Sequence, residues 1–310
     1  MTTLLKMDKL HLPDSYHYIS IYPTLRCNLR CSYCVSKSCG TNLELIGAGE
    51  RSGEEWVAML NRIESPRGVP VSFVGGECSL HKDFVYMLKN LKPELGIDLF
   101  TNLCWSEKTF REFIREIPPG RIDNHADFPS IRASYHPEQM GDGKRLLQNV
   151  LRLKDHGFDI GVEAVMYPSP AQLDAVSLMS SKCNKMDISF RVKSFLGVYE
   201  REDAEGNKIN ELYGNYTKYP GSVFQERTKN CMCKTSTLII APNFDVFKCQ
   251  RDLALRVSPI GNVGDPGFQI SDEFRPCSQY GKCHPCDVRV TTNSQWEFGY
   301  TCVDIKDVKE

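Results

Sequence analysis

The sequence lacks long apolar runs and carries almost no net charge. No hydrophobic stretch approaches the roughly 18 residues that cross a bilayer, and the first residues lack the apolar core of a signal peptide. The 38 basic and 39 acidic residues nearly cancel, so the charge gives no indication of a nucleic-acid partner. These absences predict a soluble, cytoplasmic protein that has neither a membrane nor a nucleic acid as its partner.

Cysteine, in contrast, is plentiful, with 14 residues. In a reducing compartment cysteines stay available for metal binding and redox chemistry. The densest group is a single run that contains Cys27, Cys31 and Cys34. Three thiolates at this spacing can bind three irons of a [4Fe-4S] cluster and leave the fourth iron open to another ligand. A zinc site is the alternative, with Cys39 as its nearest fourth ligand.

From residue 17 to about residue 195, β-rich runs alternate with amphipathic helical segments. The helical segments carry apolar residues at helical spacing, and Ser52 and Glu55 form a plausible capping box at the start of the first. Six consecutive βα units are two short of a closed barrel. The sequence therefore predicts an α/β fold with a partial (βα)6 TIM-like barrel, whose strands lie at 18–22, 69–74, 97–100, 130–134, 160–165 and 188–192.

Short polar motifs follow the predicted strands, where parallel α/β proteins bind their ligands. Gly75-Gly76-Glu77 comes after the second strand, Thr101 and Asn102 end the third, and Ser134 ends the fourth. Together with the Cys-x3-Cys-x2-Cys run and its aromatic Tyr33, these motifs resemble the radical S-adenosylmethionine (radical SAM) enzymes. Glycines let backbone approach a ligand closely, and a carboxylate suits an ammonium group. Ordinary turns and strand-end capping are the alternative roles.

The resemblance implies that the three cysteines hold a [4Fe-4S] cluster bound to S-adenosylmethionine. It implies that the Gly-Gly-Glu motif receives the methionyl amino group. It also implies that the other strand-end residues and Tyr33 contact the rest of the cofactor. One electron, from an external donor such as flavodoxin or ferredoxin, then generates a 5'-deoxyadenosyl radical that abstracts a hydrogen atom from the substrate. The protein positions the substrate for this chemistry. An iron–sulfur electron carrier or a zinc-dependent interaction module is the non-enzymatic alternative.

A charged, turn-rich segment at residues 200–207 separates this part from the rest of the sequence. We therefore expect one domain over residues 1–200 and a second over 201–310. The second part resembles the twitch and SPASM extensions of radical SAM enzymes, which carry auxiliary [4Fe-4S] clusters, and a zinc ribbon is the alternative. It contains the cysteines Cys231, Cys233, Cys249, Cys277, Cys283, Cys286 and Cys302.

These cysteines exceed the needs of one auxiliary cluster. The full two-cluster order of cysteines is absent, and Phe244 stands where the related hairpins usually have glycine before their cysteine. One auxiliary cluster can draw its ligands from a set that leaves Cys249 out, namely Cys231, Cys233, Cys277, Cys283 and Cys286. A thiol near a substrate radical is a hydrogen-atom donor, because an S–H bond is weaker than the C–H bond that it helps to make.

Hydrogen returned to the opposite face of a carbon inverts that carbon. The chain accordingly resembles the radical epimerases of aminoglycoside antibiotic biosynthesis, with Cys249 at the position of the donor. Cys249 as a cluster ligand, dehydrogenation of an aminocyclitol, and modification of a peptide are the alternatives. A polyamine substrate needs carboxylates around its ammonium groups, and Asp98, Glu163 and Asp187 lie in or beside predicted strands.

Overall fold

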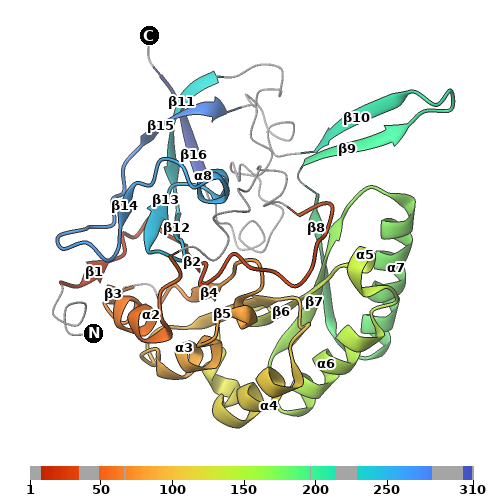
Figure 1. The fold of residues 1–310 in the computed structure, drawn as a ribbon, viewed down its shortest axis with the longest axis horizontal. Helices are drawn as coiled ribbons and strands as arrows, with labels where there is room; N and C mark the ends of the chain where they lie inside the picture. Colours follow the sequence, from red (N-terminus) through yellow and green to blue (C-terminus); the bar gives the residue numbers. More distant parts are fainter. Residues whose placement is uncertain are drawn as a thin grey trace.

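The computed structural model describes residues 8–34, 49–65, 68–195, 197–213, 229–280 and 303–308. Its largest element is a nine-stranded sheet with the order β14-β13-β12-β2-β4-β5-β6-β7-β8. The sheet curves, and helices cover its outer side (Figure 1). Six neighbouring strands are parallel and follow one another along the chain: β2 (Tyr18–Ile21), β4 (Val71–Phe73), β5 (Ile97–Thr101), β6 (Ile131–Tyr135), β7 (Ile160–Met166) and β8 (Ser189–Ser194). The predicted α/β class, with a central parallel sheet, is confirmed.

The outer helices begin and end where the sequence provides caps. Ser52 and Glu55 form the predicted capping box, in which the Ser52 N–H donates to Glu55 Oε2 over 2.9 Å. Ser169 caps the longest helix, with Pro170 as its first residue. The helices are α2 (Gly53–Leu60), α3 (Phe84–Asn90), α4 (Glu107–Glu116), α5 (Pro137–Met140), α6 (Lys144–Asp155) and α7 (Pro170–Lys185), with 3₁₀ turns η3 (Cys78–Leu80) and η4 (Pro119–Arg121).

The two faces of the parallel sheet differ because successive side chains of a strand point to opposite sides. The outer face is apolar, and its Ile19, Phe73 and Leu99 are fully buried in the same cluster as Trp56 and Phe113 of the helices. Removal of this apolar surface from water stabilises the layer of helices on the sheet. The inner face carries polar and charged side chains instead.

The chain beyond residue 200 extends the same sheet. β12 (Thr237–Ile240) pairs in parallel with β2, in a register that places Ile240 opposite Ile21. The antiparallel strands β13 (Asp245–Phe247) and β14 (Gly261–Asn262) follow outward, and α8 (Gln250–Leu255) comes after β13. The division into domains at 1–200 and 201–310 stays a prediction, since β12 joins the two parts in one sheet.

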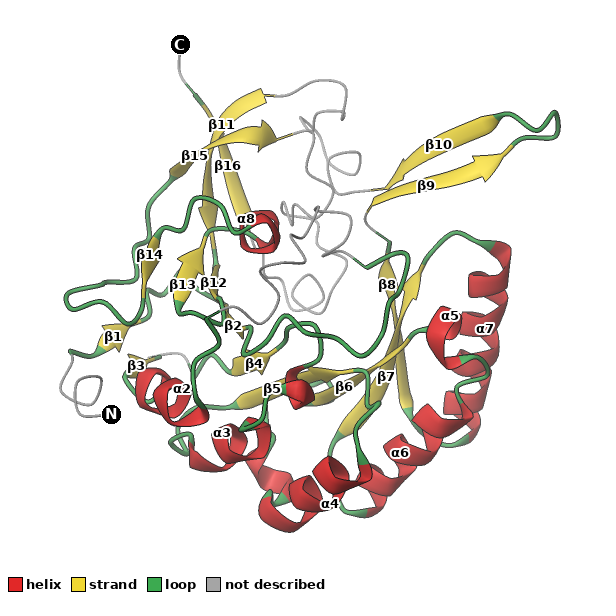
Figure 2. Ribbon diagram, in the orientation of Figure 1, coloured by secondary structure: helices red, strands yellow, loops and turns green. Residues whose placement is uncertain are grey.

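Three smaller sheets complete the described structure (Figure 2). β1 (Leu10–His11) pairs with β3 (Ile63–Glu64), and β9 (Gly197–Glu202) forms a projecting hairpin with β10 (Lys208–Tyr213). β11 (Lys229–Thr235) lies between β15 (Arg275–Tyr280) and β16 (Val303–Asp307). Within the described residues, no helix has the length and apolar character to span a membrane.

Candidate functional site

The cysteine loop, residues 22–34, starts directly after β2. The Cys27 side chain is exposed, Cys34 is half-buried and Cys31 is buried. The pKa of Cys31 is raised to about 12, mainly by burial and then by negative charge on Cys34 and Cys27. The three thiols therefore lie within electrostatic range of one another.

This electrostatic coupling fits a cation-binding role. A bound metal centre supplies the positive charge that three neighbouring thiolates need, and it deprotonates its thiol ligands. The thiols do not yet converge on one point, because within the described part of the chain no three Cys, His, Asp or Glu side chains are arranged to hold a metal ion. Three cysteine thiols remain a donor set of the type that iron–sulfur clusters use.

Gly75 and Gly76 bring the end of β4 against the backbone that precedes Cys27. The Gly76 N–H donates to Thr24 O over 3.2 Å, and the Glu77 N–H donates to Arg26 O over 2.8 Å. A Cβ atom at Gly75 would lie 2.4 Å from Thr24 O, and one at Gly76 would lie 2.3 Å from Arg26 O. Only glycine permits this approach, so the motif fixes the position of the cysteine loop.

The Glu77 carboxylate is buried, with 1% exposure, and it accepts hydrogen bonds from the end of β5. Thr101 Oγ1 donates over 2.8 Å, the Asn102 N–H over 2.7 Å and the Trp105 Nε1–H over 3.2 Å. The Ser79 N–H donates over 3.2 Å. The structure therefore brings together the predicted residues Glu77, Thr101 and Asn102. Binding of an ammonium group by this carboxylate stays a prediction, since the chain itself already provides five donors, the Cys78 thiol included.

The cysteine loop also contacts the ends of β6 and β7 through residues that the sequence did not reveal. The predicted cofactor residue Tyr33 stacks on Tyr167, with ring centroids 5.1 Å apart, and its hydroxyl lies 3.2 Å from His136 Nδ1. The N–H and hydroxyl of Ser32 both donate to Glu138 Oε2 over 2.9 Å. Burial lowers the pKa of His136 to about 4, so its ring is neutral and can accept the Tyr33 proton.

The inner face of the sheet carries a buried ion-pair network. Asp98 accepts hydrogen bonds from Tyr18, over 2.8 Å, and Ser72, over 3.0 Å, and it pairs with Arg132. Arg132, whose pKa is raised mainly by Asp98 against the opposing effect of burial, also lies over the Phe100 ring, 3.7 Å from its centroid.

Glu163 belongs to the same network. Its Oε2 lies 2.5 Å from Lys193 Nζ, and its Oε1 lies 3.9 Å from Arg132. Ser134, a predicted cofactor residue, is half-buried on this face, in register with Glu163. Asp98 and Glu163 thus have partners from the chain itself, and the ammonium groups of a polyamine need other acceptors.

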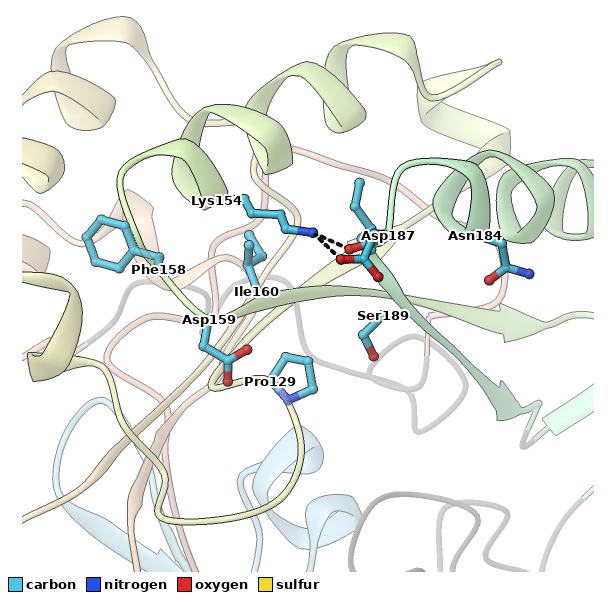
Figure 3. A pocket seen from close by; sticks show the side chains of 9 residues that line it. Pro129, Lys154, Phe158, Asp159, Ile160, Asn184, Asp187 and Ser189 are labelled. Carbon is cyan, nitrogen blue, oxygen red and sulfur yellow. Dashed lines mark hydrogen bonds and ion pairs between the residues drawn. The ribbon is translucent and has the colours of Figure 1, made fainter.

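Asp187 lies just before β8, at the amino ends of the parallel strands and so at the end of the sheet opposite the cysteine loop. It lines a pocket with Lys154 and Asp159, next to Ile160 and Ser189, the first residues of β7 and β8 (Figure 3). The side chain is exposed and pairs with Lys154. Because the cysteine loop follows the carboxyl end of β2, this pocket is remote from the candidate site.

Three of the predicted auxiliary-cluster ligands come together on the three-stranded sheet of β15, β11 and β16. Cys231 and Cys233 are two residues apart on β11, so their side chains lie on the same face of the strand. Cys231 lies opposite Cys277 of β15. Cys277 accepts hydrogen bonds from both thiols, which lowers its pKa, and the pKa of Cys233 is raised in turn. Cys283 and Cys286 lie outside the described residues, so their ligand roles stay predictions.

Cys249 precedes the first residue of α8. Its neighbour Gln250 donates from Nε2 to the Tyr22 hydroxyl over 2.7 Å. Leu253 of α8 packs with Tyr22 and Phe247 in a cluster on the face of the sheet opposite the helices. Burial raises the pKa of Cys249 to about 12, so it carries a thiol proton at neutral pH.

Comparisons with known proteins indicate the family and the fold. Residues 21–172 match the family model of the Radical SAM superfamily. The GTP 3',8-cyclase of Campylobacter lari is 24% identical over 210 residues, and the match spans 65% of this chain and 64% of that protein. The solved structure of native anSMEcpe with bound AdoMet has a similar fold, with a TM-score of 0.50 and 15% identity, over 80% of this chain and 78% of that chain. A second anSMEcpe structure, which also contains a peptide, gives a TM-score of 0.49 and 16% identity over 80% and 77%. Residues 21–172 therefore form a domain of the radical SAM superfamily.

Proposed function

We propose that this protein is a radical SAM epimerase that inverts one carbon of an aminoglycoside sugar, in a reaction of the neomycin C to neomycin B type. The superfamily implies a [4Fe-4S] cluster and S-adenosylmethionine. When bound and reduced, these groups supply a 5'-deoxyadenosyl radical that removes a hydrogen atom from a substrate carbon. Cys27, Cys31 and Cys34 are the proposed ligands of the cluster, and the loop geometry around Gly75 and Gly76 supports this assignment.

The position of Cys249 is the observation that carries the proposal. The hydrogen bond from Gln250 to Tyr22 ties the start of α8 to the residue that follows β2. Tyr22 lies five residues before Cys27, so the Cys249 segment contacts the same loop that carries the proposed cluster ligands. Tyr22 of the loop and Leu253 of α8 pack in one cluster on the side of the sheet opposite the helices. This arrangement supports a thiol that faces a substrate held at the carboxyl edge of the strands.

Cys249 is also in the protonation state that a hydrogen-atom donor requires. With a pKa raised to about 12, the side chain is a thiol at neutral pH, whereas a thiolate has no hydrogen to give. In the proposed step its S–H bond breaks, a C–H bond forms on the substrate carbon, and a thiyl radical remains. The external donor, such as flavodoxin or ferredoxin, then supplies one electron and solvent supplies one proton, which restores the thiol.

The ammonium groups of an aminoglycoside need acceptors near the loop. Glu138 provides an exposed carboxylate there, held beside the loop by its hydrogen bonds from Ser32. This placement supports a polyamine substrate at the carboxyl edge of β6. The paired carboxylates Asp98 and Glu163 instead keep the inner face of the sheet close to neutral.

Dehydrogenation of an aminocyclitol is the second candidate, and the group of Cys231, Cys233 and Cys277 favours it. An auxiliary [4Fe-4S] cluster at these thiols could accept the electron of the substrate radical, so that a proton is lost and a double bond forms. Modification of a peptide is a third outcome in related enzymes. Product mass separates the candidates, because epimerisation leaves the mass of the substrate unchanged and dehydrogenation removes two hydrogens.

The test is anaerobic incubation with reductant, S-adenosylmethionine and an aminoglycoside in deuterated water. We expect wild-type protein to give an inverted product that contains one solvent deuteron at the inverted carbon. Cys249→Ala and Cys249→Ser should still cleave S-adenosylmethionine without inversion, because an O–H bond is too strong to donate its hydrogen. Cys183→Ala, which changes a buried thiol of α7, is the matched control. Normal inversion by the Cys249 variants would refute the donor assignment.

A further inference from the structure

Asn102 has one defined orientation at the end of β5. Its backbone N–H donates to Glu77 Oε2 over 2.7 Å, and its side-chain Oδ1 accepts the Cys104 N–H over 2.8 Å. The residue is only 4% exposed. Because a backbone N–H can only donate, the atom facing Cys104 must be the amide oxygen. The Nδ2 group is therefore the end that faces the cysteine loop.

Nδ2 of Asn102 has two acceptors in that loop. It lies 2.8 Å from Asn28 Oδ1 and 3.9 Å from Cys27 Sγ. The Leu29 N–H donates to the same sulfur over 3.4 Å. Asn28 completes the connection, since its own Nδ2 donates to the Cys104 carbonyl over 2.9 Å. Cys27 thus receives one N–H donor from its own loop and one from the end of β5.

We infer that Asn102 is a positioning residue for the iron–sulfur cluster and that its side-chain amide donates an N–H···S hydrogen bond to the Cys27 sulfur. The inference rests on the proposed role of Cys27 as a cluster ligand. Hydrogen bonds to ligand sulfurs help to set the reduction potential of such clusters. An N–H donor stabilises the more negative, reduced state, so this contact raises the potential and eases the entry of the first electron.

Glu77 takes part in the same arrangement. Its carboxylate accepts the backbone N–H of Asn102, and its own N–H donates to Arg26 O, one residue before Cys27. The segments that follow β4 and β5 therefore both contact the backbone or side chain at residues 26–27. This gives Asn102 a function directed at the cluster, in addition to any contact with S-adenosylmethionine.

The experiment compares Asn102→Leu with wild type. Leucine has a similar volume and no amide, so the variant loses the donor to Cys27 and the acceptor for Cys104. Asn149→Leu is the matched control, because Asn149 Nδ2 donates to the backbone carbonyl of Leu103 in the same loop over 2.9 Å. Each protein is reconstituted anaerobically, its iron content is measured, and the cluster potential is titrated by EPR without S-adenosylmethionine.

We expect the potential of Asn102→Leu to be lower than that of wild type, while Asn149→Leu matches wild type. Equal potentials at equal iron content would overturn the inference. If Asn102→Leu takes up no cluster, wild-type protein labelled with ¹⁵N in its asparagine side-chain amides decides the question. Pulsed EPR of the reduced cluster should then show a ¹⁵N coupling, and its absence overturns the inference.

Failure of the proposed function gives a different result. A wild-type chain that takes up no [4Fe-4S] cluster at all would refute the assignment of Cys27 and with it both proposals. A normal cluster with an unchanged potential in Asn102→Leu would refute only the role of Asn102. The titration omits S-adenosylmethionine, so loss of a cofactor contact cannot produce the expected shift.

Discussion

Replacement of Glu77 by alanine tests whether this carboxylate supports the fold of the site. The side chain is 1% exposed and accepts hydrogen bonds from Thr101, Asn102, Trp105 and Ser79. Its removal leaves the Asn102 N–H and the Thr101 hydroxyl buried without this acceptor. The Trp105 N–H is affected less, since it also donates to Thr101 Oγ1 over 2.8 Å.

The magnitude follows from the cost of a buried donor without a partner. Each such donor costs about 1–3 kcal/mol, so two donors lower the free energy of unfolding by roughly 4 kcal/mol. At about 2 °C per kcal/mol, a value for large domains, Tm should fall by roughly 8 °C. Glu77→Gln retains one acceptor oxygen but turns an amide N–H toward a donor. Its free energy of unfolding should therefore fall by roughly half as much as that of Glu77→Ala.

The assay is thermal and urea unfolding of the cluster-free protein, followed by circular dichroism. Cluster-free protein is used because a direct contact with S-adenosylmethionine cannot affect its stability. Glu107→Ala is the control, since Glu107 forms exposed ion pairs with Arg111 and Arg152 that contribute little. An unchanged Tm for Glu77→Ala, together with lost binding of S-adenosylmethionine, would refute the structural role and favour direct binding by the carboxylate.

The remaining predictions concern packing, a buried ion pair and pH. Gly76→Ala places a Cβ atom 2.3 Å from Arg26 O, a backbone atom that cannot move aside, so the iron taken up per chain should fall sharply; normal iron content would contradict this. Arg132→Met leaves Asp98 buried without its cation and should lower the free energy of unfolding by about 3–5 kcal/mol in urea titrations. A loss below about 1 kcal/mol would show that Asp98 finds another partner. The pKa of His136 is lowered by burial to about 4, so the unfolded chain binds its proton first as pH falls. The free energy of unfolding should therefore be highest above pH ~6.5 and should fall by about 3 kcal/mol as the pH is lowered to 4. His136→Phe should flatten Tm against pH in that window, and parallel curves for variant and wild type would contradict the assignment.

Local sequence determined the elements of the parallel sheet. The predicted runs at 18–22, 97–100 and 160–165 coincide with β2, β5 and β7 to within one residue at each end. Strand and helix boundaries are encoded locally, because caps, glycines and the alternation of apolar residues act within a few positions. The same locality allowed the three closely spaced cysteines to indicate a cluster-binding loop.

The partners of the functional side chains required the tertiary structure. Asp98 and Arg132 were charges in separate strands, and only the strand order and the shared inner face make them an ion pair. Trp105, a further donor to Glu77, carried no sequence signal for that role. Such contacts join residues from different βα units, so no local pattern records them.

The sequence by itself determined the type and spacing of Cys27, Cys31 and Cys34, on which the prediction of a cluster with an open iron depends. The tertiary structure decided what surrounds that loop. It placed β12 beside β2 and so brought the Cys249 segment to Tyr22, more than two hundred residues earlier in the chain. The physical reason is that pairing between strands depends on backbone hydrogen bonds, which most residues can form, so the order of distant strands is set by packing of the whole sheet.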